Sequence, residues 1–140
     1  MSVVFIGDEH LAQEVLFKIK QWDDAIAKLD IYAISDLCER NMQVFDVSSQ
    51  IEGVSEFKNL WQEYKPYFAN NVRVYRKEIK IFVESDLAFM HCYAKVDHAE
   101  SDKLLNLPWC RTTLCFQKNH GKWKIAHQHI SVPQNLEKSY

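Results

Sequence analysis

The sequence predicts an α+β fold in which helices come first and an antiparallel sheet follows. Apolar residues recur every three or four positions in the first half of the chain, which is helical periodicity. From Val72 onward the period changes to two, which is typical of strands. Helices followed by strands favour one helical layer packed on one sheet. A chain of 140 residues, 47% of them hydrophobic, can bury one such core, so we interpret residues 1–140 as a single domain.

The helices are predicted from their apolar stripes and their end signals. The first stripe consists of Leu11, Val15, Ile19, Trp22, Ile26 and Leu29. Asp30 is expected to cap a second, short helix that ends near Asn41, and a short strand should follow from Met42 to Val47. A third helix is expected after Gly53, with Pro66 ending or bending it. Its inward side chains would be Phe57, Leu60, Trp61 and Tyr64.

Four strand-length segments make up the rest of the chain. They cover residues 72–83, 86–97, 109–118 and 122–132. Polar residues separate them at Glu84–Asp86, in a loop from about His98 to Pro108, and at Asn119–Gly121, where the residue types are typical of a tight turn. We therefore expect an antiparallel meander with one face covered by the helices.

Composition and charge exclude several classes of function. The net charge is −2, so no strong positive field would draw the chain to nucleic acid or to an anionic membrane. The apolar run Val3–Ile6 is too short for a signal peptide or a membrane span, so we expect a cytoplasmic protein. We interpret the cysteines as reduced hydrophobic side chains, at Cys38, Cys92, Cys110 and Cys115.

Two stretches of the chain resemble a known superfamily. Trp22 to Asp46 (WDDAIAKLDIYAISDLCERNMQVFD), followed by Gly53 and a helix, resembles the first half of SnoaL-like and ketosteroid-isomerase-like domains, which are nuclear transport factor 2-like. Arg111 to Pro133 (RTTLCFQKNHGKWKIAHQHISVP) resembles their last two strands, and also the end of the association domain of calcium/calmodulin-dependent protein kinase II. The resemblance implies a cystatin-like fold, in which a curved antiparallel sheet wraps around N-terminal helices as a cone with a pocket. It also implies a homodimer that packs through the outer face of the sheet.

Asp46 is the first candidate catalytic residue. It matches the position of the general base of ketosteroid isomerase, an enzyme in which an Asp base works beside an oxyanion hole. The resemblance places Trp22 where that enzyme has its oxyanion tyrosine, and an indole N–H is a weaker acid than a phenol. The alternative is a hydrogen-bonded or solvated aspartate at the end of a strand.

The histidines of the last strand are the second candidate. His127 and His129 are two positions apart, so they should share a face with Trp123, Ile125 and Ser131. Together with His91 they would form a zinc site with an open position, or His129 would act as an acid or base near neutral pH. The alternative is a set of hydrogen-bonded structural histidines. We expect no metal and no cofactor.

Arg111 and Thr113 resemble a frequent Arg-x-Thr pair of SnoaL-like domains. An Arg111 that faced the cone would need an anion, either the carboxylate of a ligand or an internal partner such as Asp46 or Glu78. An aromatic lining would suit a flat, apolar ligand. Its expected members are Trp22, Phe45, Trp61, Tyr64 and Tyr93.

These features leave three functions open. The first is cofactor-independent isomerase, cyclase or dehydratase chemistry at Asp46 or a histidine. The second is binding of a small apolar or carboxylate-bearing molecule without reaction. The third is an oligomerising interaction domain that acts through the outer face of its sheet. Both pocket functions predict that Asp46, Arg111 and His129 lie within one cavity.

Overall fold

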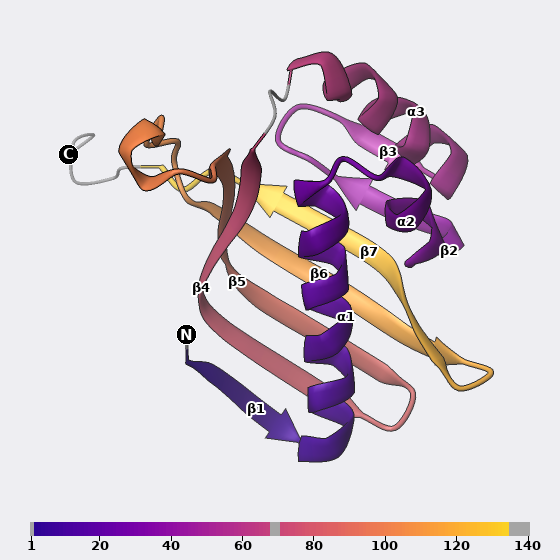
Figure 1. Cartoon of the computed structure of the whole chain (residues 1–140). Helices are drawn as coiled ribbons and strands as arrows, with labels where there is room; N and C mark the ends of the chain where they lie inside the picture. Colours follow the sequence, from indigo (N-terminus) through magenta and orange to yellow (C-terminus); the bar gives the residue numbers. More distant parts are fainter. Residues whose placement is uncertain (1, 68–70, 135–140) are drawn as a thin grey trace.

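The helices lie on one face of a curved sheet in the computed structural model, which describes residues 2–67 and 71–134 (Figure 1). The helices are α1 (Glu9–Ala27), α2 (Ile31–Asp36) and α3 (Val54–Tyr64), with short 3₁₀ turns at Lys65–Tyr67 and Ser101–Lys103. The strands are β1 (Val3–Gly7), β2 (Cys38–Phe45), β3 (Gln50–Glu52), β4 (Val72–Glu84), β5 (Leu87–His98), β6 (Cys110–Asn119) and β7 (Lys122–Ser131). Helix α1 crosses the sheet, whereas α2 and α3 lie at the end where β2 and β3 are found (Figure 1).

Each of the first two helices begins at an aspartate. The Asp8 carboxylate accepts a hydrogen bond of 3.0 Å from the N–H of Leu11, at the start of α1. The Asp30 carboxylate accepts one of 3.1 Å from the N–H of Ala33 in α2, which confirms the predicted cap. Both bonds satisfy N–H groups that have no partner inside the helix.

The second helix and two strands depart from the predicted pattern. Helix α2 ends at Asp36 rather than near Asn41, because Cys38 already belongs to β2. Pairing with the last strand draws the chain out of the helix, as the N–H of Ile125 donates to the carbonyl of Leu37 at 2.8 Å. Strands β1 and β3 are not predicted, because β1 is a continuous apolar run without alternation and β3 has only three residues.

The predicted meander of β4, β5, β6 and β7 is confirmed. The seven-stranded sheet of the described residues has the order β1-β4-β5-β6-β7-β2-β3. Two pairs outside this meander are parallel, since β1 pairs with β4 and β2 pairs with β7 in this way. These pairs join distant segments, which local sequence patterns do not specify.

An extra residue in β7 reverses its two faces. Ile125 and His127 pair with consecutive residues of β6, so Ala126 has no partner. This is a β-bulge, which shifts the alternation of side chains by one position. Ile125 is buried towards the helices before the bulge, and Gln128 is buried after it. His127 and His129 therefore lie on the face of the sheet opposite to that of Ile125, not beside it as predicted.

The core forms where α1 and α3 meet the sheet. Its largest fully buried side chains are Trp22, Phe116, Ile19, Ile34, Met42, Ile79, Ile81, Met90, Leu114, Ile125, Val15 and Val44. Burying one such side chain stabilises the fold by about 1.5–3 kcal/mol. Among the described residues, no helix is long and apolar enough to cross a membrane.

A buried aspartate organises the loop between β5 and β6. Asp97 is 2% exposed and accepts hydrogen bonds from the N–H groups of His98 (2.7 Å), Leu105 (2.9 Å) and Leu107 (3.4 Å). The ammonium of Lys95 lies 3.6 Å from the same carboxylate. The N–H of Leu105 is the main cause of a pKa of Asp97 below its ordinary value, since it stabilises the ionised form.

Candidate functional site

A cavity of about 220 Å³ lies between the helices and the sheet. Its helical wall consists of Trp22, Ile26, Phe57, Leu60, Trp61 and Tyr64. The sheet contributes Val44, Asp46, Val74, Arg76, Ala94, Lys95, Val96, Cys110, Thr112, Gln128 and Ile130. The lining is mostly apolar with a few polar groups, which is the usual composition of a small-molecule site.

Aromatic rings form a continuous wall along the helical side. Trp22 stacks on Phe57 with their ring centroids 5.9 Å apart and the planes at 3°. Phe57 meets Trp61 edge to face at 6.3 Å, and Trp61 meets Tyr64 in the same way at 6.4 Å. The i, i+4 and i, i+3 spacing of the last three places them on one side of α3, facing the stripe of α1.

Asp46 belongs to the lining directly after the end of β2. It lies two positions beyond Val44 on the same side of the chain. Its N–H donates to the carbonyl of Ser49 at 2.8 Å, and one carboxylate oxygen accepts the N–H of Val47 at 2.7 Å. The turn thus fixes the Asp46 backbone and leaves the other carboxylate oxygen available to a ligand. Burial raises the pKa of the Cys110 thiol, and the charge of Asp46 raises it further.

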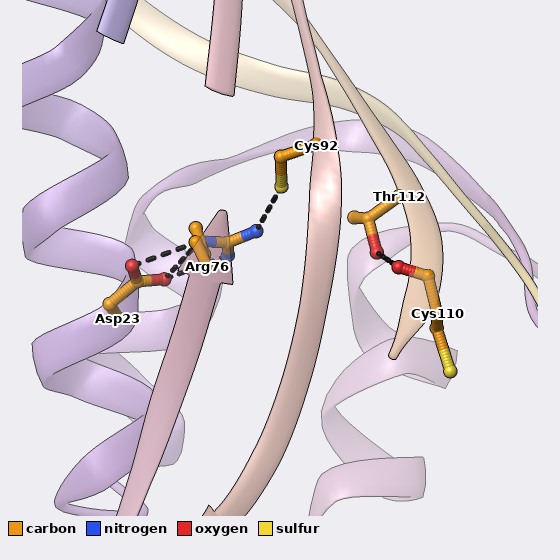
Figure 2. A network of polar contacts seen from close by, with 5 residues as sticks. All are labelled: Asp23, Arg76, Cys92, Cys110 and Thr112. Carbon is orange, nitrogen blue, oxygen red and sulfur yellow. Dashed lines mark hydrogen bonds and ion pairs between the residues drawn. The ribbon is translucent and has the colours of Figure 1, made fainter. Parts of the chain in front are cut away.

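Arg76 is a buried cation that sequence reasoning did not assign to the site. Its side chain is 4% exposed, and Figure 2 shows it between Asp23 of α1 and Cys92 of β5. Nε donates to the Asp23 carboxylate at 2.9 Å and a terminal nitrogen donates at 2.7 Å, which is a bidentate ion pair. The other terminal nitrogen donates to the Cys92 sulfur at 3.4 Å.

The ion pair keeps Arg76 charged in the core. Burial alone would lower the pKa of Arg76, but the charge of Asp23 and its hydrogen bonds raise it above the ordinary value. Burial raises the pKa of the Cys92 thiol, against the opposite effect of Arg76. At neutral pH Arg76 therefore stays charged and the Cys92 thiol stays protonated.

The polar groups of the lining differ in how they are satisfied. The Trp22 indole N–H is buried and has no hydrogen-bond partner among the described residues. The Thr112 hydroxyl makes a long contact of 3.5 Å with the carbonyl of Cys110 (Figure 2). Gln128 brings a buried amide, which is both a donor and an acceptor.

The structure brings the helical half of the predicted site together. Trp22, Trp61 and Tyr64 line the cavity with Asp46, as expected. The prediction that Asp46, Arg111 and His129 share this cavity is wrong. Arg111 is exposed and donates to the Ser131 hydroxyl at 3.1 Å and to the carbonyl of Val132 at 3.5 Å, rather than to Asp46 or Glu78.

The remaining predicted residues lie on the outer face, which we define as the side of the sheet without helices. His91, Thr113, His129 and Phe45 are register partners on consecutive strands, as are Tyr93, Arg111 and Ser131. His127 joins them through Phe45, with ring centroids 5.1 Å apart. On β6 the buried residues are Thr112, Leu114 and Phe116. Side chains alternate along a strand, so Arg111 and Thr113 lie on the outer face.

The predicted histidines do not form a metal centre. The ring centroids of His127 and His129 are 6.3 Å apart, and His91 lies beside Phe82. In the part of the chain that the structure describes, no three His, Cys, Asp or Glu side chains form a group able to hold a metal ion. The histidines are therefore not arranged as the zinc-site hypothesis requires.

Several lining residues were missed from the sequence. They are Ile26, Phe57, Leu60, Val44, Val74, Arg76, Ala94, Lys95, Val96, Cys110, Thr112, Gln128 and Ile130. A signal existed for Arg76, which continues the alternation of Val72 and Val74 towards the helices. For Gln128 the sequence carries no such signal, because the bulge at Ala126 changes the phase just before it.

Solved structures with the same fold share little sequence with this chain. An NTF2-like protein of unknown function from Pseudomonas putida has a TM-score of 0.81 at 19% identity, over 95% of this chain and 94% of that one. A protein of unknown function with a cystatin-like fold from Nostoc punctiforme has a TM-score of 0.79 at 16% identity, over 93% and 96%. A protein from Shewanella frigidimarina, provisionally named a ketosteroid isomerase, has a TM-score of 0.71 at 21% identity, over 91% and 100%.

The fold expected from the resemblance is therefore confirmed: an α+β cone of the NTF2-like, cystatin-like kind. No curated protein matches the chain significantly in sequence. The family model of the SnoaL-like domain matches residues 15–135, which include every residue that lines the cavity. The chain belongs to the SnoaL-like family.

Proposed function

We propose that the chain binds a small, largely apolar molecule in this cavity. The observation that carries the proposal is the aromatic wall around a space of about 220 Å³. An apolar cavity of roughly 150 Å³ is enough to hold benzene, so a molecule of one or two rings suits this volume. The polar groups of Asp46, Thr112 and Gln128 also support the proposal, because a few polar groups in an apolar lining fix the orientation of a ligand.

Blocking the cavity tests the proposal. Ile130 belongs to the lining, whereas Val132 is exposed and outside it, so Ile130→Trp and Val132→Trp are a matched pair. A thermal-shift screen of one- and two-ring compounds, followed by calorimetry, identifies ligands of the parent protein. We expect these to stabilise the Val132→Trp variant and not the Ile130→Trp variant. An equal response of both variants would mean that binding takes place elsewhere.

Asp46 favours a second candidate function, which is cofactor-independent acid–base catalysis. It is a carboxylate in a mostly apolar lining, a setting in which a base can move a proton between carbon atoms. Similar structures with provisional names as a dehydratase and as a ketosteroid isomerase support this class of reaction. His129 has no part in this proposed reaction, because it lies on the outer face.

Proton exchange tests the catalytic candidate. A ketone that binds the cavity is incubated with the protein in D₂O, and loss of its α-proton signal is followed by NMR. We expect Asp46→Asn to abolish the exchange while the Kd stays within about twofold, because the amide keeps the shape of the carboxylate. Exchange at the same rate in the variant would contradict a role for Asp46 as the base.

We further propose a homodimer that packs through the outer face. Two phenylalanines on this face support it, since Phe45 is 43% exposed and Phe89 is 42% exposed. Exposed apolar groups on one sheet face are typical of a protein interface. Phe89→Glu should give a monomer in sedimentation, whereas Tyr32→Glu, at a residue of α2 that is 70% exposed, should not. A parent protein that sediments as a monomer would contradict the proposal.

The cysteines support a cytoplasmic location. All four are free, and Cys38 and Cys92 are buried. Burial raises the pKa of Cys38 to about 12, so its thiol stays protonated and unreactive. Free thiols are typical of proteins in reducing compartments. Equal melting temperatures with and without a reductant would be expected from such a protein.

A further inference from the structure

The charged groups of the cavity are unequally paired. Arg76 and Lys95 are the cations of the described lining, and each has its own carboxylate, Asp23 at 2.7 Å and Asp97 at 3.6 Å. Asp46 is the carboxylate of the lining, and in the described part of the chain no cation lies within ion-pair distance of it. The cavity therefore has one negative charge without a partner.

The position of Asp46 makes this charge accessible to a ligand. The side chain is half-buried in the lining, and among the described residues its carboxylate accepts a hydrogen bond from the N–H of the next residue, Val47. A carboxylate has about four acceptor positions, so most of its capacity remains. Its charge also reaches Cys110 on β6, which lies in the same lining.

The aromatic wall adds a second attraction for positive charge. Trp22, Phe57, Trp61 and Tyr64 line the same cavity as Asp46. Ring faces attract ammonium groups, most strongly at tryptophan, and rings grouped around a cavity bind quaternary ammonium ions. A carboxylate among such rings supplies the counter-charge. We infer that the ligand of the cavity is an organic cation, a protonated or quaternary amine with an apolar body.

This inference rests on the proposed binding function and replaces the carboxylate-bearing ligand expected from the sequence. That expectation depended on Arg111, which lies on the outer face. The arginine that does line the cavity, Arg76, already holds Asp23 in a bidentate pair. An anionic ligand would meet the unpaired charge of Asp46 and find no unpaired cation among the described lining residues.

Three probes of similar shape test the inference on the intact protein. Phenyltrimethylammonium and tert-butylbenzene are isosteres that differ in charge, and benzoate is the anionic comparison. We expect the cation to bind more tightly than benzoate. In Asp46→Asn the preference for the cation over its neutral isostere should fall by about fivefold, the size of a partly exposed ion pair. Added salt should weaken binding of the cation alone.

Asp86→Asn is the matched control, because Asp86 is an exposed carboxylate in the turn after β4 and lies outside the cavity lining. It should leave the charge preference unchanged. Tighter binding of benzoate than of the cation, or an unchanged preference in Asp46→Asn, would overturn the inference while leaving a pocket that binds small molecules. Failure of all three probes and of the wider compound screen would instead remove the proposed function itself.

Discussion

The ion pair between Asp23 and Arg76 allows a quantitative test of the structure. Removing the carboxylate in Asp23→Leu leaves the guanidinium of Arg76, which is 4% exposed, without a counter-charge. Losing one partner of a buried pair costs about 3–5 kcal/mol, and Asp23 is 24% exposed, so water offsets part of the loss. We expect about 3 kcal/mol. With an m-value of roughly 2 kcal/mol/M, the urea midpoint should fall by about 1.5 M.

The complementary variants complete a double-mutant cycle. Arg76→Met leaves Asp23 near solvent, so it should cost less, about 1–2 kcal/mol. The double variant Asp23→Leu/Arg76→Met removes both charges and keeps apolar volume, and it should lie within about 1 kcal/mol of the parent. Urea unfolding followed by circular dichroism measures all four proteins. The reasoning is refuted if Asp23→Leu costs less than about 1 kcal/mol, or if the losses in the single variants simply add in the double.

Three further predictions concern other parts of the chain. The pKa of Asp97 is lowered in the fold, so its ionised carboxylate stabilises the folded state at neutral pH. The unfolded state binds more protons in acid, and this stabilisation is lost as the pH falls below about 4. Unfolding of the parent and of Asp97→Asn between pH 2 and 7 should show a steeper acid loss in the parent, and parallel curves would contradict this. A Cβ at Gly7, where φ is +105°, would lie 2.1 Å from a backbone oxygen of β4, whereas at Gly121, where φ is +77°, it would meet nothing within 4 Å. Gly7→Ala should therefore be destabilised by about 3 kcal/mol or more and Gly121→Ala by about 1 kcal/mol, and equal midpoints in urea would count against the structure. Cys110 lines the cavity and Cys115 lies outside its lining, so a bound ligand should slow labelling of the first thiol by a disulfide reagent and leave the second unchanged. Equal protection of both would argue against binding in the cavity.

The helical half of the site could be predicted because its information is local. The stripe of α1 and the spacing in α3 depend only on the period of the helix, and they placed Trp22, Trp61 and Tyr64 correctly. The cap at Asp30 is also a short-range signal. The position of Asp46 came from the resemblance to the family rather than from periodicity, and the structure brings it to the same cavity.

The sheet half of the site could not be predicted in the same way. Alternation says which residues share a face, but not which face meets the helices. On β6 the alternation of Thr112, Leu114 and Phe116 indicated the buried face, and the resemblance drew attention to Arg111 and Thr113 instead. The parallel partners of β1 and β2 depend on contacts between distant segments, which no local pattern encodes.

The unpaired residue of β7 gives this cone an unusual route to new chemistry. Gln128 now presents a neutral amide to the cavity, while His127 and His129 lie on the reverse of the same strand. If the bulge closed by a slip of one residue against β6, Ala126 would pair with Cys115 and these two sets would exchange sides, bringing two imidazoles inside without altering any residue. In such a strand, a shift of register by one position has the effect of several substitutions. Removing the bulge while keeping the length of the strand is thus a means by which evolution or design can convert a binding cavity into one that holds titratable groups.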